Sequence, residues 1–487
     1  MPISEETFFL DQKFEGTLQS QIQQMVAEGI LSGRFRPGEK LPSSRRLAKH
    51  LGISRITITL AYTELVADDY IISRGRSGYF VSENAPQPPR FDTLRPREDA
   101  VDWQRAIGQR FSGATNLEKP RNWKDFTYNF IYGQADQSLF DHQNWRHCAL
   151  RALGQRDFDA LTSDYYEHDD PKLIEFIARH TLPRRGILAR PEEILVTMGA
   201  QNALWLAAQV LLTQRRTAAT EDPCYPGLRE ILHHTRCHVH SVPVDQNGLP
   251  PSALPTDVDV LFLTPSHHCP TSSTMPVSRR QELLARAERD EFLIVEDDYE
   301  FEMSFLEPPS PSLKSLDQSG RVIYVGSFSK SLFPGLRLGY LVGSAPFIRE
   351  ARALRSAVLR HPPGHIQRTA AYFLSHGHYD ALIRRMGQAY HQRRNVMDQA
   401  IREHGLHIAG KGVFGGSSFW MKAPPGVNAA LLTALLRKRG VLIENGQPFF
   451  SKNETSSGFY RLAYSSIPAE KIPEGIAHIA DVMKSLQ

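Results

Sequence analysis

The sequence predicts a multidomain protein with a small helical N-terminal domain that ends in a hairpin, a large α/β domain and a smaller C-terminal α+β subdomain. A chain of 487 residues is too long for one ordinary hydrophobic core. After Val81 comes a stretch rich in proline and polar residues, as in a linker. Beyond it, short apolar runs alternate with helical stretches, which indicates a largely parallel central sheet. We therefore expect domains over residues 1–82 and 123–487, joined by a linker over 83–122.

Composition excludes several classes of protein. Apolar residues make up 41% of the chain and charged residues 23%, the ordinary range of a soluble globular protein. No window approaches the roughly 18 uninterrupted apolar residues of a membrane span, and the N-terminus is acidic where a secretory signal is basic. We expect a cytoplasmic protein with no membrane partner. The four cysteines lack the spacing of a zinc site or redox pair, so we expect free thiols and no metal site.

Residues 43–69 predict two short helices joined by a tight turn. Ser43 or Ser44 is a good N-cap for the stretch SSRRLAKHL, which Gly52 ends. Ser54 then caps the stretch RITITLAYTELVADD. Such a pair is typical of a helix-turn-helix, whose second helix enters the major groove of DNA.

The second helix and the segment after it complete this domain. We expect its apolar face to include Ile58, Ala61, Leu65 and Val66. The residues that we expect on its other faces are Arg55, Thr57, Thr59 and Tyr62. From Tyr70 to Val81, two short extended runs flank a turn of glycine and arginine, the pattern of a wing hairpin beside the DNA backbone.

Basic side chains are concentrated in this domain. Between Arg34 and Arg55, seven basic residues stand against a single acid, Glu39. Arginines can pair with phosphates or guanine edges, and hydroxyls can contact phosphates. The candidate DNA contacts are Ser44, Arg45, Arg46, Ser54, Arg55, Thr57, Arg74 and Arg76. The string PGEKLPSSRRLAKHLGISRITITLAYTELVADDYIISRGRSGYFV resembles the winged helix-turn-helix of GntR-type regulators, which implies a double-stranded DNA operator as partner.

The strongest chemical signal in the large domain is the string SFSKSLFPGLRLGY. Here Lys330 follows an apolar strand, with Ser327, Ser329 and Arg337 close by in the sequence. A lysine amine can form a Schiff base with an aldehyde cofactor. Hydroxyls and an arginine fork suit a phosphate dianion. The string therefore predicts a site for a phosphorylated aldehyde cofactor.

Three strings upstream supply matching groups. FLIVEDDYEFE places Asp297 and Tyr299 at the end of a buried strand, where a carboxylate can keep a pyridine nitrogen protonated and a phenol can bond the ring's 3′ oxygen. VTMGAQNALWLA has a glycine-led turn into a helix, so the backbone N–H groups of Ala200 and Gln201 can hold the phosphate. EDPCYPG offers the ring of Tyr225 for stacking on the cofactor.

In this order the motifs resemble the fold-type I aminotransferases, which depend on pyridoxal 5′-phosphate. With the N-terminal segment, the whole chain resembles the MocR/GabR family of regulators, in which that fold senses rather than metabolises. The resemblance implies an internal aldimine on Lys330, a pyridine-nitrogen partner in Asp297, a 3′-oxygen partner in Tyr299, a stacking ring in Tyr225, and phosphate ligands in Ser327 and Arg337. It also implies that Arg461 binds the effector's carboxylate or sulfonate, and that the protein is a homodimer.

The sequence departs from the family's pattern at several positions. Ser272 replaces a glycine in the loop TPSHHCPTSSTMP, and Cys269 replaces an asparagine that touches the cofactor. The pair His267 and His268, in the same loop, is within reach of the cofactor on sequence grounds. Gly227 stands where a GABA-sensing relative has an arginine, which argues against GABA as the ligand. The string NFIYGQADQSLF resembles the subgroup that responds to taurine or ectoine-derived diamino acids.

Three functions fit these observations. The dense helix-turn-helix favours a DNA-binding transcriptional regulator that senses a small amine, amino acid or amino sulfonate through external aldimine formation. An active aminotransferase with a fused DNA-binding domain is an alternative, and the sequence leaves residual transaminase activity open because all the catalytic groups are present. A regulator that senses pyridoxal phosphate itself is the third.

Overall fold

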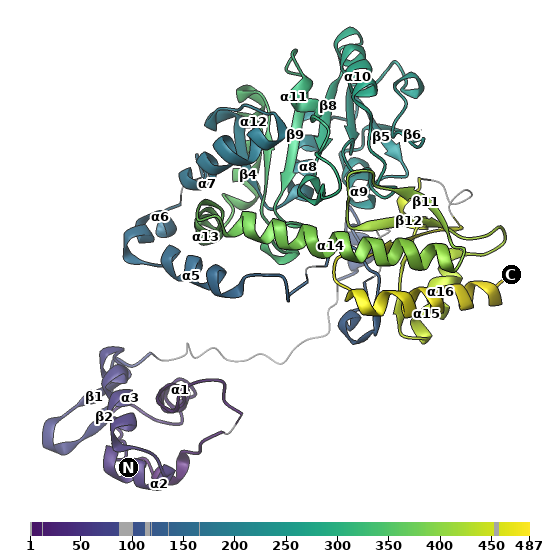
Figure 1. Cartoon of the computed structure of the whole chain (residues 1–487). Helices are drawn as coiled ribbons and strands as arrows, with labels where there is room; N and C mark the ends of the chain where they lie inside the picture. The colour runs from purple at the N-terminus through teal and green to yellow at the C-terminus, as the bar shows by residue number, and fades with distance from the viewer. Residues whose placement is uncertain are drawn as a thin grey trace. The chain divides into compact units, whose positions relative to one another are not determined.

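The structure is a computed structural model that describes residues 2–11, 13–86, 101–112, 117, 119–134, 136–164, 166–451 and 457–487. The chain forms two compact units, residues 1–109 and 110–487 (Figure 1). Much of the expected linker, residues 87–100, 113–116 and 118, lies outside the described residues. Its described part contains a short helix, α4 (Trp103–Ala106). No helix among the described residues is both long and apolar enough to cross a membrane.

The N-terminal unit has the predicted helices and hairpin. Its elements are α1 (Leu18–Leu31), α2 (Ser44–Leu51), α3 (Arg55–Ala67), β1 (Ile71–Ser73) and β2 (Tyr79–Val81). Ser43 caps α2, because its hydroxyl accepts the backbone N–H of Arg46. Gly52 ends α2 in the left-handed conformation, and Ser54 caps α3. Strands β1 and β2 pair antiparallel as the hairpin.

The core of this unit lies between α1 and α3. Ile22, Val26 and Ile30 of α1 are buried, as are Ile58, Ala61 and Leu65 of α3. The expectation that Tyr62 lies on another face is wrong, since its side chain is fully buried. Its hydroxyl donates a hydrogen bond to the carbonyl oxygen of Pro42 at 3.0 Å. A tyrosine can enter a core when its polar end finds such a partner.

The large unit is built on a seven-stranded sheet (Figure 1). In spatial order its strands are β4 (Ile194–Thr197), β10 (Gly339–Val342), β9 (Val322–Ser327), β8 (Leu293–Asp297), β7 (Val260–Leu263), β5 (Thr217–Asp222) and β6 (His238–Pro243). Strand β10 runs antiparallel to both of its neighbours, and the remaining pairs are parallel. The expectation of a largely parallel sheet is confirmed.

Helices cover both faces of this sheet. One face packs against α8 (Ala200–Leu211), α9 (Pro226–Thr235) and α12 (Ala345–Leu359). The other packs against α10 (Val277–Arg289) and α11 (Leu313–Leu316). Alternation along β8 explains the division, because Val295 enters the first core and Ile294 the second. Both faces are therefore buried, and a ligand can reach the sheet only at the ends of its strands.

The predicted C-terminal α+β subdomain is also present. Its antiparallel sheet has the order β11 (His407–Lys411), β12 (Ser418–Lys422), β15 (Phe459–Ala463) and β14 (Glu444–Asn445). Helices α15 (Ala429–Lys438) and α16 (Ile472–Ser485) pack with it, and the long helix α14 (His378–Glu403) lies beside α16 (Figure 1). The remaining α-helices of the large unit are α5 (His142–Ala152), α6 (Phe158–Thr162), α7 (Pro171–Phe176) and α13 (Gly364–Ser375). The short strand β3 (Tyr128–Asn129) pairs with β13 (Val441–Leu442) and leads directly into the site described next.

Candidate functional site

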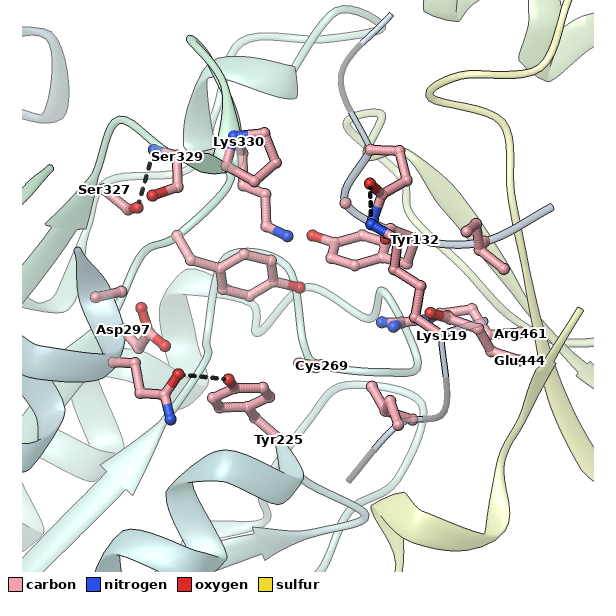
Figure 2. Close-up of a pocket in the computed structure, with 18 of the residues that line it drawn as sticks. Lys119, Tyr132, Tyr225, Cys269, Asp297, Ser327, Ser329, Lys330, Glu444 and Arg461 are labelled. Carbon is pink, nitrogen blue, oxygen red and sulfur yellow. Dashed lines mark hydrogen bonds and ion pairs between the residues drawn. The ribbon is translucent and has the colours of Figure 1, made fainter. Parts of the chain in front are cut away.

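A cavity of about 310 Å³ opens where several strands of the large sheet end. Asp297 is the last residue of β8 and Ser327 the last of β9, while Tyr225 follows β5. Of the predicted cofactor residues in the large domain, the cavity is lined by Tyr225, Ala200, Gln201, Asp297, Tyr299, Ser327, Ser329, Lys330 and Arg337 (Figure 2). Nine positions spread over some 140 residues of sequence thus meet in one place.

Asp297 faces the cavity because strand alternation turns its two acidic neighbours the other way. Glu296 accepts the backbone N–H groups of Leu313 and Lys314, each at 2.8 Å. Asp298 accepts a hydrogen bond from Arg185 Nε at 2.6 Å. Asp297 is buried, and its Oδ1 has no hydrogen-bond partner in the described part of the chain. Burial, reinforced by the charge of Asp298, raises the pKa of Asp297 to about 8. A cationic ring N–H placed against it would supply both the missing partner and the missing charge.

The amine of Lys330 lies in the same cavity, against a tyrosine ring. Its Nζ is 4.1 Å from the centre of the Tyr132 ring. Gly133 leaves the amine its space, since a Cβ at that position would lie 2.4 Å from Nζ. Burial lowers the pKa of Lys330 to about 8, although the nearby Glu300 carboxylate opposes that shift. The neutral, nucleophilic form of this amine is therefore far more populated near neutral pH than it is in an ordinary lysine.

A cradle for an anion lies where β4 turns into α8. Gly199 has φ of +82°, and a Cβ there would lie 3.3 Å from Arg337 Nη2 and 3.5 Å from Ser329 Oγ. The Ser329 hydroxyl is buried, and no partner for it lies among the described residues. Helix α8 has no side-chain cap, and its first two residues, Ala200 and Gln201, line the cavity, so the N–H groups of its first turn are available to an anion there. A phosphate dianion fits these donors.

The remaining predicted ligands border the cavity. The hydroxyl of Ser327 accepts the backbone N–H of Ser329 at 3.2 Å and orders the turn before Lys330. The phenol of Tyr225 donates to Oε1 of Gln201 at 3.5 Å. A Cβ at Gly227 would lie 2.6 Å from the Tyr225 ring, so the residue that replaces the relative's arginine makes room for that ring.

Arg461 lines the cavity, but it already holds an anion of the chain itself. Its Nε donates to Oε2 of Glu444 at 2.7 Å, and both side chains are nearly excluded from solvent. The two residues lie opposite each other on β15 and β14. The Arg461 guanidinium also stacks on Tyr132, 4.0 Å from the ring centre, and lies 4.8 Å from that of Phe449.

The lining residues that the sequence did not predict include Lys119, Tyr132 and Glu444. Tyr132 falls inside the string that resembles the taurine- and ectoine-responsive subgroup, so a signal was present for it. Lys119 falls inside the expected linker, and Glu444 has no local motif.

The loop over residues 264–276, which departs from the family's pattern, contributes only Cys269 to the lining of the cavity. Cys269 lines the cavity, and burial raises the pKa of its thiol to about 11. Ser272 keeps a left-handed φ of 59°, the conformation that the replaced glycine would favour. The two histidines are buried and do not line the cavity. His268 Nδ1 bonds Thr271 Oγ1 at 2.7 Å, and burial lowers the pKa of His267 to about 4.

Three potential metal ligands lie together elsewhere in the large unit. Within the described residues, Cys148, His376 and His378 place ligand atoms within 4.8 Å of one another, although no metal site was expected. Arg151 Nη1 lies 3.1 Å from Nε2 of His376. That guanidinium adds a positive charge beside the cluster, which opposes a metal cation.

In the N-terminal unit, all five predicted DNA-contacting arginines are exposed, and some of them contact neighbouring side chains. Arg46 forms an ion pair with Glu5 at 2.7 Å, and Arg55 Nε donates to Ser44 Oγ at 3.3 Å. Arg74 lies over the Phe80 ring at 4.8 Å. The others are placed as follows: Arg45 and Arg76 are exposed, Thr57 is half-buried, and the hydroxyl of Ser54 is the N-cap of α3.

Comparison with known proteins assigns the chain to a family. Residues 18–81 match the bacterial regulatory proteins of the gntR family, and residues 136–479 match aminotransferase class I and II. The chain is 59% identical over 485 residues to the HTH-type transcriptional regulator TauR of Rhodobacter capsulatus, covering 99% of this chain and 100% of that protein. It is 30% identical over 407 residues to the probable rhizopine catabolism regulatory protein MocR of Rhizobium meliloti, covering 81% and 79% of the two chains. The chain belongs to the MocR-type transcriptional regulators.

Solved structures support the fold of this MocR-type regulator. LysN, an α-aminoadipate aminotransferase from Thermus thermophilus, is 28% identical with a TM-score of 0.70, over 79% of this chain and 99% of that one. That structure is complexed with N-(5′-phosphopyridoxyl)-L-leucine. An archaeal alanine:glyoxylate aminotransferase, 23% identical with a TM-score of 0.69 over 79% and 100% of the two chains, shows the same fold. The MocR-type regulator therefore joins a DNA-binding helix-turn-helix to a fold-type I aminotransferase domain.

Proposed function

We propose that this MocR-type regulator holds pyridoxal 5′-phosphate at Lys330 and senses a small molecule that carries both an amine and a sulfonate or carboxylate. The observation that carries the proposal is that three features meet in one cavity. They are the amine of Lys330 with its lowered pKa, the Oδ1 of Asp297, which has no hydrogen-bond partner among the described residues, and the anion cradle at Gly199. Each feature suits a different part of the same cofactor. Perturbed groups that meet in one cavity mark functional sites more often than structural ones.

Different residues of the cavity would hold different parts of the cofactor. Ser329, Arg337 and the first turn of α8 would hold its phosphate, and Asp297 would hold its ring nitrogen in the protonated state. When bound, the cofactor supplies an aldehyde carbon that an amine can attack. Lys330 would supply such an amine, and a ligand with an amine of its own would compete with it for the cofactor. Tyr225 and Tyr299 would bound the ring and orient it.

The ligand that we propose is an amino sulfonate of the taurine type. The sequence of residues 129–140 resembles the subgroup of regulators that responds to taurine or ectoine-derived diamino acids. The chain is also 59% identical to TauR. Arg461 offers a guanidinium in the same cavity as Lys330, so a ligand with both groups can contact both residues. The cavity of about 310 Å³ must hold both the cofactor and the ligand, which restricts the ligand to a small molecule.

The test is a spectral and DNA-binding titration of the full chain. Protein loaded with pyridoxal phosphate should absorb visible light, and borohydride should bleach that band and fix the cofactor covalently in wild type but not in Lys330→Ala. Taurine should change the band and also change the affinity for a DNA fragment selected from random sequences. A colourless wild type that cannot be reconstituted contradicts the proposal. Accumulation of a keto or aldehyde product over many turnovers would favour an active aminotransferase instead.

A further inference from the structure

Two residues of the segment that precedes β3 in the sequence border the cavity. Leu117 and Lys119 both line it, together with Lys330 and Arg461. Leu117 packs on a small apolar cluster that includes Trp420 and Phe449. Lys119 lies on the same side of the cavity as Arg461 and Glu444, across from Asp297 (Figure 2). Two cations from distant parts of the sequence, Lys119 and Arg461, therefore border this side of the cavity.

These two cations differ in how their charge is balanced. The charge of Arg461 is matched at 2.7 Å by the carboxylate of Glu444. The amine of Lys119 instead donates to the neutral amide oxygen of Gln134 at 2.7 Å and lies 4.7 Å from the centre of the Trp123 ring. No ion pair between Lys119 and a carboxylate occurs within the part of the chain that the structure describes. Desolvation by partial burial lowers the pKa of Lys119, and the charge of Lys124 adds to that shift.

From this difference we propose that Lys119 is a specificity-determining residue that binds the anionic end of the effector, alongside Arg461. The inference rests on the proposed function, since it concerns the same cavity and the same ligand class. A sulfonate has three oxygens, so it can accept hydrogen bonds from the Lys119 ammonium and the Arg461 guanidinium together. A ligand with an amine but no anion gains nothing from either residue.

The position of Lys119 in the chain gives this contact a second consequence. Lys119 lies in the sequence between the helix-turn-helix, which ends at Val81, and the first strand of the large unit, β3. An effector held by Lys119 restrains the segment that connects the two units. Ligand occupancy is thereby coupled to the connection through which the DNA-binding unit is attached.

Taurine and ethylamine form a matched pair of probes, because ethylamine is taurine without its sulfonate. The cofactor-loaded full chain is titrated with each, and the midpoint is read from the visible band. Lys119→Gln should raise the taurine midpoint about 10-fold, the loss expected for one charge-assisted hydrogen bond, and leave the ethylamine midpoint unchanged. Lys119→Arg should restore most of the taurine response. Lys124→Gln is the control, because Lys124 also lies over Trp123, at 5.8 Å, but does not line the cavity.

The outcomes separate this inference from the proposed function. Equal taurine midpoints in Lys119→Gln and wild type overturn the inference while the proposed function stands. A wild type whose band responds to neither probe overturns the proposed function, and the inference falls with it. At saturating taurine, Lys119→Gln should also show a reduced change in DNA affinity. A full change in that variant would overturn the coupling and leave Lys119 as an anion ligand alone.

Discussion

Arg461 donates from Nε to a carboxylate oxygen of Glu444 at 2.7 Å, from directly opposite positions on two paired strands. The residue predicted to bind the effector's anion therefore has an anion of its own in the protein. An effector must compete with that carboxylate or share the guanidinium with it. Because both side chains are nearly excluded from solvent, the attraction between them is weakly screened. The affinity of the cavity for an anion is thus set by Glu444 as much as by Arg461.

Glu444→Gln should strengthen the response to taurine. The amide keeps a hydrogen-bond acceptor for Arg461 but removes the competing charge, so the taurine midpoint should fall several-fold. Arg461→Ala should raise the midpoint strongly, since losing a buried charged partner costs about 2 to 5 kcal/mol, and Arg461→Lys should recover only part of it. Glu403→Gln, at an exposed position near the end of α14, is the control. Identical midpoints in Glu444→Gln, Arg461→Ala and wild type would show that the anion is bound elsewhere.

The capture of pyridoxal phosphate by cofactor-free protein should depend on the titration of Lys330. Its pKa is lowered to about 8 by burial, and only the neutral amine attacks an aldehyde. The rate at which the visible band develops should therefore rise with pH through about 8 and then level off. Stopped-flow absorbance at a series of pH values measures it. A midpoint near the ordinary lysine pKa of about 10.4 would mean that the amine is more solvated than the structure indicates.

Asp297 should make the cofactor-free protein less stable as pH rises. Its pKa is raised from the ordinary 3.8 to about 8, so the folded protein keeps a proton that the unfolded chain releases between these values. The stabilising contribution is fully present below the unfolded pKa and is lost as pH rises through the folded one. Between about pH 5 and 8, Asp297→Asn should lose less stability than wild type in urea unfolding of the large domain. Parallel curves for the two proteins would contradict the shift. Asp297→Ala should also bind cofactor more weakly, by about 1.5 to 3 kcal/mol.

The ion pair between Arg46 and Glu5 should modulate DNA affinity. Arg46→Ala should weaken binding and reduce the salt dependence by about one counterion, if Arg46 contacts a phosphate. Glu5→Gln should strengthen DNA binding, because the Glu5 carboxylate, 2.7 Å from the Arg46 guanidinium, neutralises that charge in the free protein. Fluorescence anisotropy at several salt concentrations measures both effects. The visible band should be unchanged in each variant, and its loss would show that the substitution disturbs the large unit.

The sequence predicts those parts of the site that follow directly from local structure. Asp297, Ser327 and Lys330 stand at or just beyond strand ends, and Gly199 leads a helix, so short strings carry their placement. Glu444 could not be found in this way, because it reaches Arg461 only through the register of β14 and β15. Lys119 lies in a polar stretch without periodicity, whose contacts depend on the tertiary fold.

The fold shows the same division between local and non-local information. Caps and turns at Ser43, Gly52 and Ser54 fix the helices of the N-terminal unit, and all three are visible in the sequence. The burial of Tyr62 is not visible there, since it depends on a carbonyl oxygen 20 positions away. Periodicity assigns an apolar residue to a face, but a tyrosine follows whichever partner its hydroxyl can reach.

Gly133, whose absent side chain leaves Lys330 its space, has a practical use. With φ of +73° and only 2.4 Å between the position of a Cβ and the lysine nitrogen, even alanine would be strained and would displace the amine. Gly133→Ala should therefore yield an effector-blind allele with an unaltered DNA-binding domain. Placed in the chromosome, such an allele would report how the promoter behaves under permanent apo-regulator control, independent of what the cell imports or synthesises.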